Sequence, residues 1–260
     1  MKVISFNANG IRSAARKGFY DWLQLQQADF VCIQETKAQL DQLTLDPIYF
    51  PQNFHCEYYD ALKKGYSGVA IYARQKPLQV IKGLGFDDCD TEGRYIQFDY
   101  PNLSVISIYL PSGSSGDERQ QVKFGFLERL AIHLQALKDV GRELIICGDY
   151  NIAHKKIDIK NWRGNQKNSG FLPEERAWMD TLFDKMGYVD AFRLRNQAEE
   201  EYTWWSNRGQ AWANNVGWRI DYQVITQGLV EHVVDVDIYR DTRFSDHAPL
   251  SIEYQGDWCV

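Results

Sequence analysis

Short apolar runs rich in β-branched and aromatic residues recur from one end of this 260-residue chain to the other. Each run has the length of a β-strand, and several alternate in polarity, as strands do when a sheet packs on one face and is covered on the other. We therefore expect sheets to form the frame of the fold. The predicted strands cover residues 2–7, 29–34, 68–74, 94–100, 103–110, 143–148, 220–226, 232–238 and 248–254.

Three stretches have the apolar spacing of a helix. One begins near Asp117 and another at Pro173, which is followed by two glutamates in a first turn where proline and acids suit a helix start. A shorter helix around residues 19–23 links the first two strands. Helices and strands alternate without strict βαβ order, which favours packed sheets with helices outside them in one α/β (α+β) domain over residues 1–260.

Composition places the chain among ordinary globular proteins, with 44% apolar and 25% charged residues. The net charge of −6 gives no sign of a nucleic-acid partner, although a carboxylate metal site and a local basic rim are compatible with an acidic total. The five cysteines form no CxxC pair, so we expect reduced thiols. No apolar run approaches the roughly 20 residues of a membrane span. We expect a cytoplasmic protein without a membrane partner.

Acids, amides and one histidine lie at the ends of the predicted strands. Strand ends are rigid, and the loops there carry chemistry in many proteins. These groups bind hard cations and activate water, so their recurrence predicts one composite site. They are Asn7, Glu35, Asp149, Asn151, Asp221, Asp246 and His247, and the hydroxyl of Tyr109 lies at a further strand end.

Glu35 directly follows a predicted strand and can hold Mg²⁺ or Mn²⁺ through oxygen. An exposed loop acid that caps the next turn would have the same pattern. Asp149 and Asn151 alternate with Tyr150, so in extended backbone their side chains leave on the same side. Such a pair can hold and deprotonate a water molecule, and an ordinary Asx turn after a strand is the alternative.

Asp246 and His247 are adjacent, so in extended backbone they point to opposite sides and have different roles. Asp246 can orient a metal, a water or another histidine, whereas His247 can bind or polarise a phosphate oxygen. His247 needs a carboxylate to fix its tautomer, and Asp221 from another strand is a candidate. A structural salt bridge is the alternative for this pair.

Polar and basic groups nearby describe a substrate surface. Asn7, Asn9 and Tyr109 can position a phosphate, while Arg12 and Lys37 can hold a phosphate backbone. The carboxylate, the Asp-Asn pair and the Asp-His pair together fit metal-assisted hydrolysis of a phosphate ester.

A second substrate feature is a region crowded with aromatic and basic side chains. Aromatic groups on a loop can stack against a base or sugar, or displace it. Core packing is the alternative for at least two of the tryptophans, and a solvated face is the alternative for the basic run. The aromatic residues are Trp204, Trp205, Trp212 and Trp218, and the basic run is Lys155, Lys156, Lys160, Arg163 and Lys167.

Six motifs span nearly the whole chain: SFNANGIR (5–12), QETK (34–37), YLPSG (109–113), GDYNIAH (148–154), NVGWRIDY (215–222) and SDHAPL (245–250). In this order and spacing they resemble the exonuclease III and abasic-site endonuclease family, within the DNase I-like endonuclease/exonuclease/phosphatase superfamily. The resemblance implies a four-layered αββα sandwich, with two packed, mostly antiparallel sheets and helices outside.

The resemblance also implies roles around a metal and a water molecule. Glu35 would be the main metal ligand, with Asn7 close to the ion. Asp149 would orient or deprotonate the attacking water, assisted by Asn151. Asp246 would support the neighbouring histidine or a second metal position.

Further implied roles concern the substrate. His247, held by Asp221, would contact the scissile phosphate, and Tyr109 would assist with the phosphate or the leaving oxygen. Trp204 and Trp218 match positions that line the abasic-sugar pocket in the family. The implied enzyme depends on Mg²⁺ or Mn²⁺, cuts duplex DNA 5′ to abasic sites, and removes nucleotides 3′→5′ from duplex ends by in-line attack of water to leave a 3′-hydroxyl.

The chain is also similar to the catabolite repression control proteins, which are RNA-linked translational regulators. In typical regulators the positions matching Glu35, Asp149, Asn151 and Asp246 are altered, whereas all four residues are intact here. Gathering unpaired acids in a cleft is unfavourable without a cation. We therefore expect an active, monomeric nuclease, with RNA left open as a substrate, and keep the regulator as the alternative. A phosphatase acting on a small lipid or sugar fits the tryptophan-rich region less well.

Overall fold

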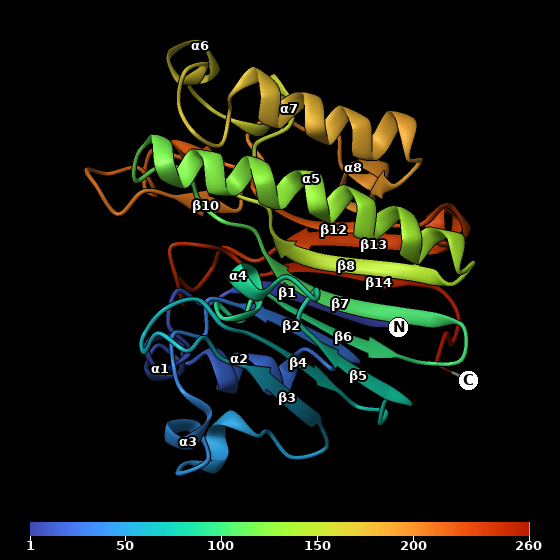
Figure 1. Ribbon diagram of the computed structural model, residues 1–260. Helices are drawn as coiled ribbons and strands as arrows, with labels where there is room; N and C mark the ends of the chain where they lie inside the picture. Colours follow the sequence, from blue (N-terminus) through green and yellow to red (C-terminus); the bar gives the residue numbers. More distant parts are fainter. Residues whose placement is uncertain (260) are drawn as a thin grey trace.

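Two six-stranded sheets pack face to face in the computed structural model, which describes residues 1–259, and helices cover both outer faces (Figure 1). The first sheet has the order β13-β14-β1-β2-β4-β3 and the second β5-β6-β7-β8-β12-β9. The strands of the first are β1 (Lys2–Asn7), β2 (Phe30–Gln34), β3 (His55–Tyr59), β4 (Val69–Ala73), β13 (Val233–Ile238) and β14 (Leu250–Tyr254). Those of the second are β5 (Gln79–Lys82), β6 (Tyr95–Asp99), β7 (Leu103–Tyr109), β8 (Glu143–Asp149), β9 (Val189–Asp190) and β12 (Asp221–Ile225).

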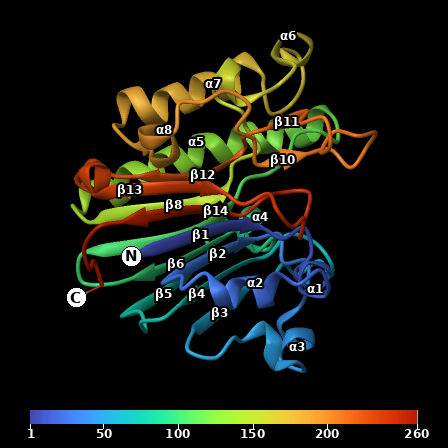
Figure 2. The same cartoon turned by 180° about the vertical axis from the view of Figure 1, so that it is seen from behind.

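The helices lie on the two outer faces of the sandwich, as Figures 1 and 2 show from opposite sides. Helices α1 (Ile11–Arg16) and α2 (Phe19–Leu25) cover the first sheet, and α5 (Asp117–Asp139) and α7 (Pro173–Asp180) cover the second. The short helices are α3 (Leu40–Leu43), α4 (Asp87–Asp90), α6 (Trp162–Asn165) and α8 (Ala191–Arg195), and a π-helical turn (Thr181–Lys185) extends α7. Among residues 1–259, no helix combines the length and apolarity needed to cross a membrane.

Three apolar clusters separate the four layers. Successive residues of a strand point to opposite faces. Ile145 therefore enters the core between the sheets, while Ile146 packs beneath α5 and α7. On β2, Cys32 faces the second sheet and Ile33 faces α1 and α2. Because both faces are covered, the central strands are continuous apolar runs rather than alternating ones.

Each sheet contains one parallel strand pair among otherwise antiparallel neighbours. The parallel pairs are β1 with β2 and β7 with β8, and each needs a helical crossover, supplied by α1 and α2 in the first case and α5 in the second. The four-layered, mostly antiparallel αββα sandwich expected from the sequence is confirmed, as are all nine predicted strands. The prediction missed β3 and β5, which lie at sheet edges, and the very short β9, β10 (Trp204–Trp205) and β11 (Gly217–Trp218).

A buried ion network fastens the second sheet to the loop that follows β8. Asp158 accepts hydrogen bonds from Arg219 Nε at 2.8 Å and Arg193 Nη2 at 2.7 Å. Burial alone would raise the pKa of the Asp158 carboxyl, but the two guanidinium groups outweigh it and lower this pKa to about 2. The carboxylate therefore stabilises the fold above the pKa of the unfolded chain, near 4, and this contribution is lost as the pH falls through about 2.

We predict that Asp158→Asn lowers the free energy of unfolding by roughly 2 kcal/mol at pH 7, because a pKa depressed by nearly two units corresponds to that energy. The deficit should narrow as the pH falls from 4 towards 2, where the wild-type carboxylate becomes protonated. Urea unfolding of both proteins at pH 7 and pH 3 measures it. An equal deficit at both pH values would contradict the assignment.

Candidate active site

The parallel strand pairs bring polar residues from both sheets to one edge of the sandwich. Asn7 lies beside Gln34 at the ends of β1 and β2, and Asp149 lies between Tyr109 and Asp221 in the second sheet. A cleft of about 830 Å³ opens at this edge. Gly148 lets β8 approach β7 closely, because a Cβ at this position would lie 2.2 Å from the Ile108 carbonyl oxygen.

Most of the site residues predicted from the sequence line this cleft. Other residues, which the sequence analysis did not single out, line it as well. Asn7 and Asp221 lie buried behind it, in contact with the lining residues. Arg12 is exposed on α1 and is not among the lining residues. The predicted residues that line the cleft are Asn9, Glu35, Lys37, Tyr109, Asp149, Asn151, Trp204, Trp218, Asp246 and His247.

Asn7 connects the two sheets through its side-chain amide. Its Nδ2 donates to Glu35 Oε1 at 2.9 Å and to Asp149 Oδ2 at 2.8 Å, while its Oδ1 accepts from the backbone N–H of Asn9. All of its polar atoms are thus engaged within the protein. Asn7 acts by holding the two carboxylates at a fixed separation.

Asn151 lies beside Asp149 because the backbone turns directly after β8. The N–H of Asn151 donates to Asp149 Oδ1 at 2.8 Å, and its φ of 52° is left-handed. Its side-chain Nδ2 donates to the Leu110 carbonyl at 2.9 Å and lies 3.4 Å from Asp149 Oδ2. The Asx turn that the sequence offered as the alternative is present, and this turn, not strand alternation, places the amide beside the carboxylate. The action of the pair on a water molecule stays a prediction.

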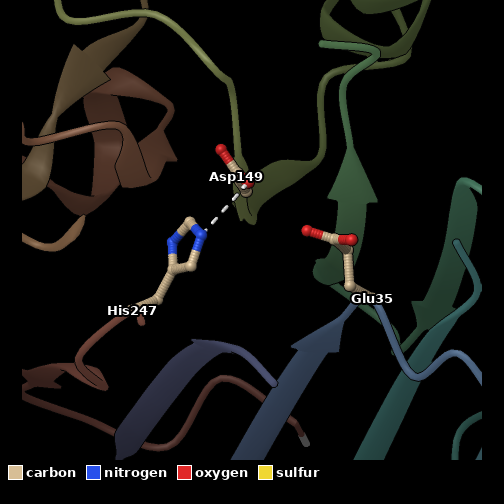
Figure 3. Close-up of side chains that lie close together, drawn as sticks. All are labelled: Glu35, Asp149 and His247. Carbon is tan, nitrogen blue, oxygen red and sulfur yellow. Dashed lines mark ion pairs between the residues drawn. The ribbon is translucent and has the colours of Figure 1, made fainter. Parts of the chain in front are cut away.

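His247 is almost fully buried in the cleft wall, and Figure 3 shows its ring beside Asp149. Its Nδ1 donates to Asp221 Oδ2 at 2.8 Å, and its Nε2 lies 3.9 Å from Asp149 Oδ2. Burial would lower the pKa of His247, but the charge and hydrogen bond of Asp221 raise it to about 10. The imidazole is therefore protonated at neutral pH, and its Nε2–H faces the cleft.

The pKa of Asp149 is raised to about 7, first by burial and then by the charge of Asp221, with His247 acting in the opposite direction. A carboxyl with this pKa exchanges a proton near neutral pH, as a general base must. Tyr109 behaves differently. Burial, with the charges of Glu35 and Asp149, holds its pKa well above the usual range, so its hydroxyl remains a donor.

Asp246 organises the rim of the cleft. It accepts hydrogen bonds from Asn9 Nδ2 at 2.8 Å, Trp204 Nε1 at 3.2 Å and the hydroxyl of Ser245 at 3.1 Å. Burial would raise the pKa of Asp246, but the charge of His247 and these hydrogen bonds lower it. Asp246 therefore links the loop after β1, through Asn9, to the indole of Trp204.

Three side chains offer ligand atoms that lie within 4.8 Å of one another: Glu35, Asp149 and His247. Two carboxylates are suitable ligands for a hard divalent cation, which would also relieve their mutual repulsion. The imidazolium of His247 is better suited to an anion on the opposite side of the same space. Asp246, which the sequence predicts to support His247 or a second metal position, is not one of these three residues, and its metal role stays a prediction.

The backbone around the cleft is strained. Asn9, Glu35, Lys37 and Asn151 all have φ between 42° and 52°, a left-handed conformation that costs non-glycine residues about 1 kcal/mol or more. Such conformations persist where the surroundings impose them, and they cluster at functional sites. In this cleft they turn the Glu35 and Asn151 side chains towards Asp149.

One wall of the cleft is aromatic. Trp204 and Trp218 face each other across β10 and β11, with ring centroids 6.1 Å apart in an edge arrangement. Trp205 and Trp212 pack instead against the core between the sheets, as the core interpretation predicted for two of the four tryptophans. Trp218 also borders the small apolar cluster that contains Ile220.

The predicted basic run divides into several environments. Lys155 pairs with Asp180 and Lys160 with Glu200, whereas Lys167 lines the cleft. Arg208 also lines the cleft and was missed in the sequence, where nothing distinguishes it from other surface arginines.

Comparison with known proteins places this arrangement in a family. Residues 4–247 match the endonuclease/exonuclease/phosphatase family. The exodeoxyribonuclease of Bacillus subtilis is 41% identical over 254 residues, covering 97% of this chain and 98% of the relative, and the DNA repair nuclease APEX1 of Danio rerio is 36% identical over 97% and 81%. The structure of an AP endonuclease from Archaeoglobus fulgidus superposes with a TM-score of 0.89 at 29% identity, over 98% of this chain and 100% of that one.

The chain therefore belongs to the endonuclease/exonuclease/phosphatase family. Within that family it is a DNA-repair nuclease, an enzyme that hydrolyses phosphodiester bonds with the help of a divalent metal ion. These findings confirm the family, the fold and the enzyme class expected from the sequence.

We predict that Asp221→Asn lowers kcat for DNA hydrolysis by about 100-fold or more, a loss typical of removing one stabiliser of transition-state charge. An amide cannot hold the imidazolium of His247 as a carboxylate does. Asp235→Asn, at an exposed position on β13, is the matched control and should keep wild-type turnover. If Asp221→Asn is folded and fully active, Asp221 is not what holds His247.

Proposed function

We propose that this nuclease uses Mg²⁺ or Mn²⁺ to cut duplex DNA 5′ to abasic sites and to remove nucleotides 3′→5′ from duplex ends, leaving a 3′-hydroxyl. The observation that carries the proposal is the position of the Asp149–His247 pair directly beside the tryptophan wall. The names of the relatives, which include a DNA repair nuclease and AP endonucleases, support the same substrate.

The chemistry follows from the positions of three groups. Asp149, fixed by Asn7 and Asn151, accepts the proton of a water molecule that attacks phosphorus in line. The Nε2–H of His247 stabilises the charge that develops on a phosphoryl oxygen. A divalent ion held by Glu35 and Asp149 would supply further neutralisation of the phosphate. The Tyr109 hydroxyl, which keeps its proton, donates to the phosphate or to the leaving oxygen.

The lining of the cleft supports a nucleic-acid substrate in spite of the net charge of −6. Lys37, Lys167 and Arg208 line it and can contact phosphates on either side of the scissile bond. The aromatic wall of Trp204 and Trp218 suits a sugar that carries no base, because an apolar surface gains from covering the ring of such a sugar.

We also propose a monomer located in the cytoplasm. All five cysteines are free, and Cys32, Cys89 and Cys147 are buried, which agrees with a reducing compartment. Whether RNA is cut as well is read from the same assay with an RNA duplex.

The central test is incision of a duplex oligonucleotide that carries one abasic site, with Mg²⁺, with Mn²⁺ and with EDTA. Cutting should require the metal, and Asp149→Asn should lower turnover by roughly 10³-fold while DNA binding largely persists, because the variant keeps the shape but loses the proton acceptor. The exposed Asp41→Asn is the control. If the folded wild type cuts nothing with either metal, the RNA-linked regulator becomes the better assignment.

The variant Trp218→Ala tests whether the aromatic wall contributes to the choice of substrate. Incision at the abasic site should fall more than removal of nucleotides from a plain 3′ end, since only the first reaction uses the space beside the ring. Trp258→Ala, near the other end of the molecule and packed on His232, serves as the control for loss of an indole. Equal losses on both substrates would refute the role of Trp218 in substrate choice.

A further inference from the structure

A fully buried ion pair lies directly behind the cleft and takes no part in the chemistry above. Lys123 of α5 and Glu175 of α7 are both 0% exposed, and Lys123 Nζ lies 2.5 Å from Glu175 Oε1. Burying two charges costs free energy that their attraction recovers only with good geometry and further hydrogen bonds. Two apolar side chains would stabilise the junction of these helices at least as well, so the pair invites a functional explanation.

Lys123 holds the backbone of the active site. Its Nζ donates to the carbonyl oxygen of Asn151 at 2.7 Å. Asn151 is the residue whose N–H and side-chain amide contact Asp149. The peptide of Asn151 is therefore fixed on one side by the catalytic carboxylate and on the other by the buried ammonium.

Glu175 holds the opposite wall of the cleft. Its Oε2 accepts the backbone N–H groups of Gly170 at 2.6 Å and Leu172 at 3.0 Å. Its Oε1 also accepts from Gln120 Nε2 at 3.1 Å. Gly170, Leu172 and Gln120 all line the cleft, so one buried carboxylate gathers three of the lining residues.

Gly170, which Glu175 holds, packs against both the Asn151 backbone, which Lys123 holds, and the aromatic wall. A Cβ on Gly170, which has a φ of +93°, would lie 3.0 Å from Trp218 Cζ3 and 3.1 Å from the Asn151 carbonyl oxygen. The turn that contains Gly170, the Asn151 carbonyl group and the Trp218 ring are therefore close-packed without spare room. A displacement of Gly170 by a few tenths of an ångström must move the ring or the peptide.

We propose that Lys123 and Glu175 are positioning residues that lock the Asn151 peptide and the Gly170–Leu172 wall into one rigid unit and so set the space beside Trp218. That space determines the preference for an abasic sugar over an intact nucleotide. The inference rests on the proposed function and adds to it the residues that determine substrate choice without touching the substrate.

The test uses the double variant Lys123→Met/Glu175→Gln, because a single change would leave one charge buried and unpaired. The new amide can still accept from Gly170 and Leu172. Its NH₂ donates to Gln120 Oε1 once the Gln120 amide, whose Nε2 now faces Glu175, turns over by 180°. The double variant therefore keeps most of the hydrogen bonds but loses the hold on Asn151.

We expect kcat for abasic incision to fall by about 10- to 100-fold, the usual cost of a displacement near 1 Å in an active site. The ratio of kcat/KM for abasic incision to that for a plain 3′ end should fall as well. Gly170→Ala, which pushes on Trp218 directly, should lower the same ratio. Leu134→Ala, a buried change on α5 away from the cleft, is the control and should lower Tm while leaving the ratio unchanged.

The outcomes separate the two proposals. A folded double variant with the wild-type ratio and kcat would overturn the positioning role while leaving the proposed function intact. If the double variant loses Tm and loses abasic incision and 3′-end removal equally, so that the ratio stays at the wild-type value as in Leu134→Ala, the positioning role is also overturned. Lys123 and Glu175 would then have a structural role only. A wild type that does not cut abasic DNA would remove the proposed function, and this inference with it.

Discussion

The site depends on one constraint, the face-to-face packing of two sheets that each contain a parallel strand pair. Parallel neighbours end at the same edge, so β1 with β2 and β7 with β8 each deliver two strand ends to one place. Packing the sheets together then brings Glu35 and Asp149, which are 114 residues apart in sequence, to either side of the Asn7 amide. The reactive groups are as fixed as the core that holds the sheets together.

Electrostatics then gives the two central groups different protonation states. Asp149 and His247 lie within 4 Å of each other, and both are affected by Asp221. Burial and then the charge of Asp221 raise the pKa of Asp149 towards neutrality, while the charge of Asp221 outweighs the burial of His247 and keeps it protonated. Asp221 thereby contributes to both a proton acceptor and a cationic donor, a division of roles between neighbouring titratable groups that recurs in hydrolytic enzymes.

Much of this could be predicted from the sequence, because both the strands and the polar residues at their ends are local patterns. The role of Asp246 as a hydrogen-bond acceptor could not be chosen over its alternatives, because its partner Asn9 is 237 residues away in the chain. The Asx turn at Asn151 is a local contact, which is why the sequence offered it as an alternative. The role of Lys123 could not be predicted for a different reason. A lysine in a helical sequence predicts an exposed face, and only the position of Glu175 explains why Lys123 is buried.

The pairing of the first strand with the last ties the cleft to the completion of the first sheet. β1 pairs with β14 on one side and with β2 on the other, and His247 lies in the segment that leads into β14 (Figure 2). A chain without residues 245–254 keeps Glu35 and Asp149 but lacks both the imidazole of His247 and the strand that joins β13 to β1. The same ten residues therefore complete both the first sheet and the cleft.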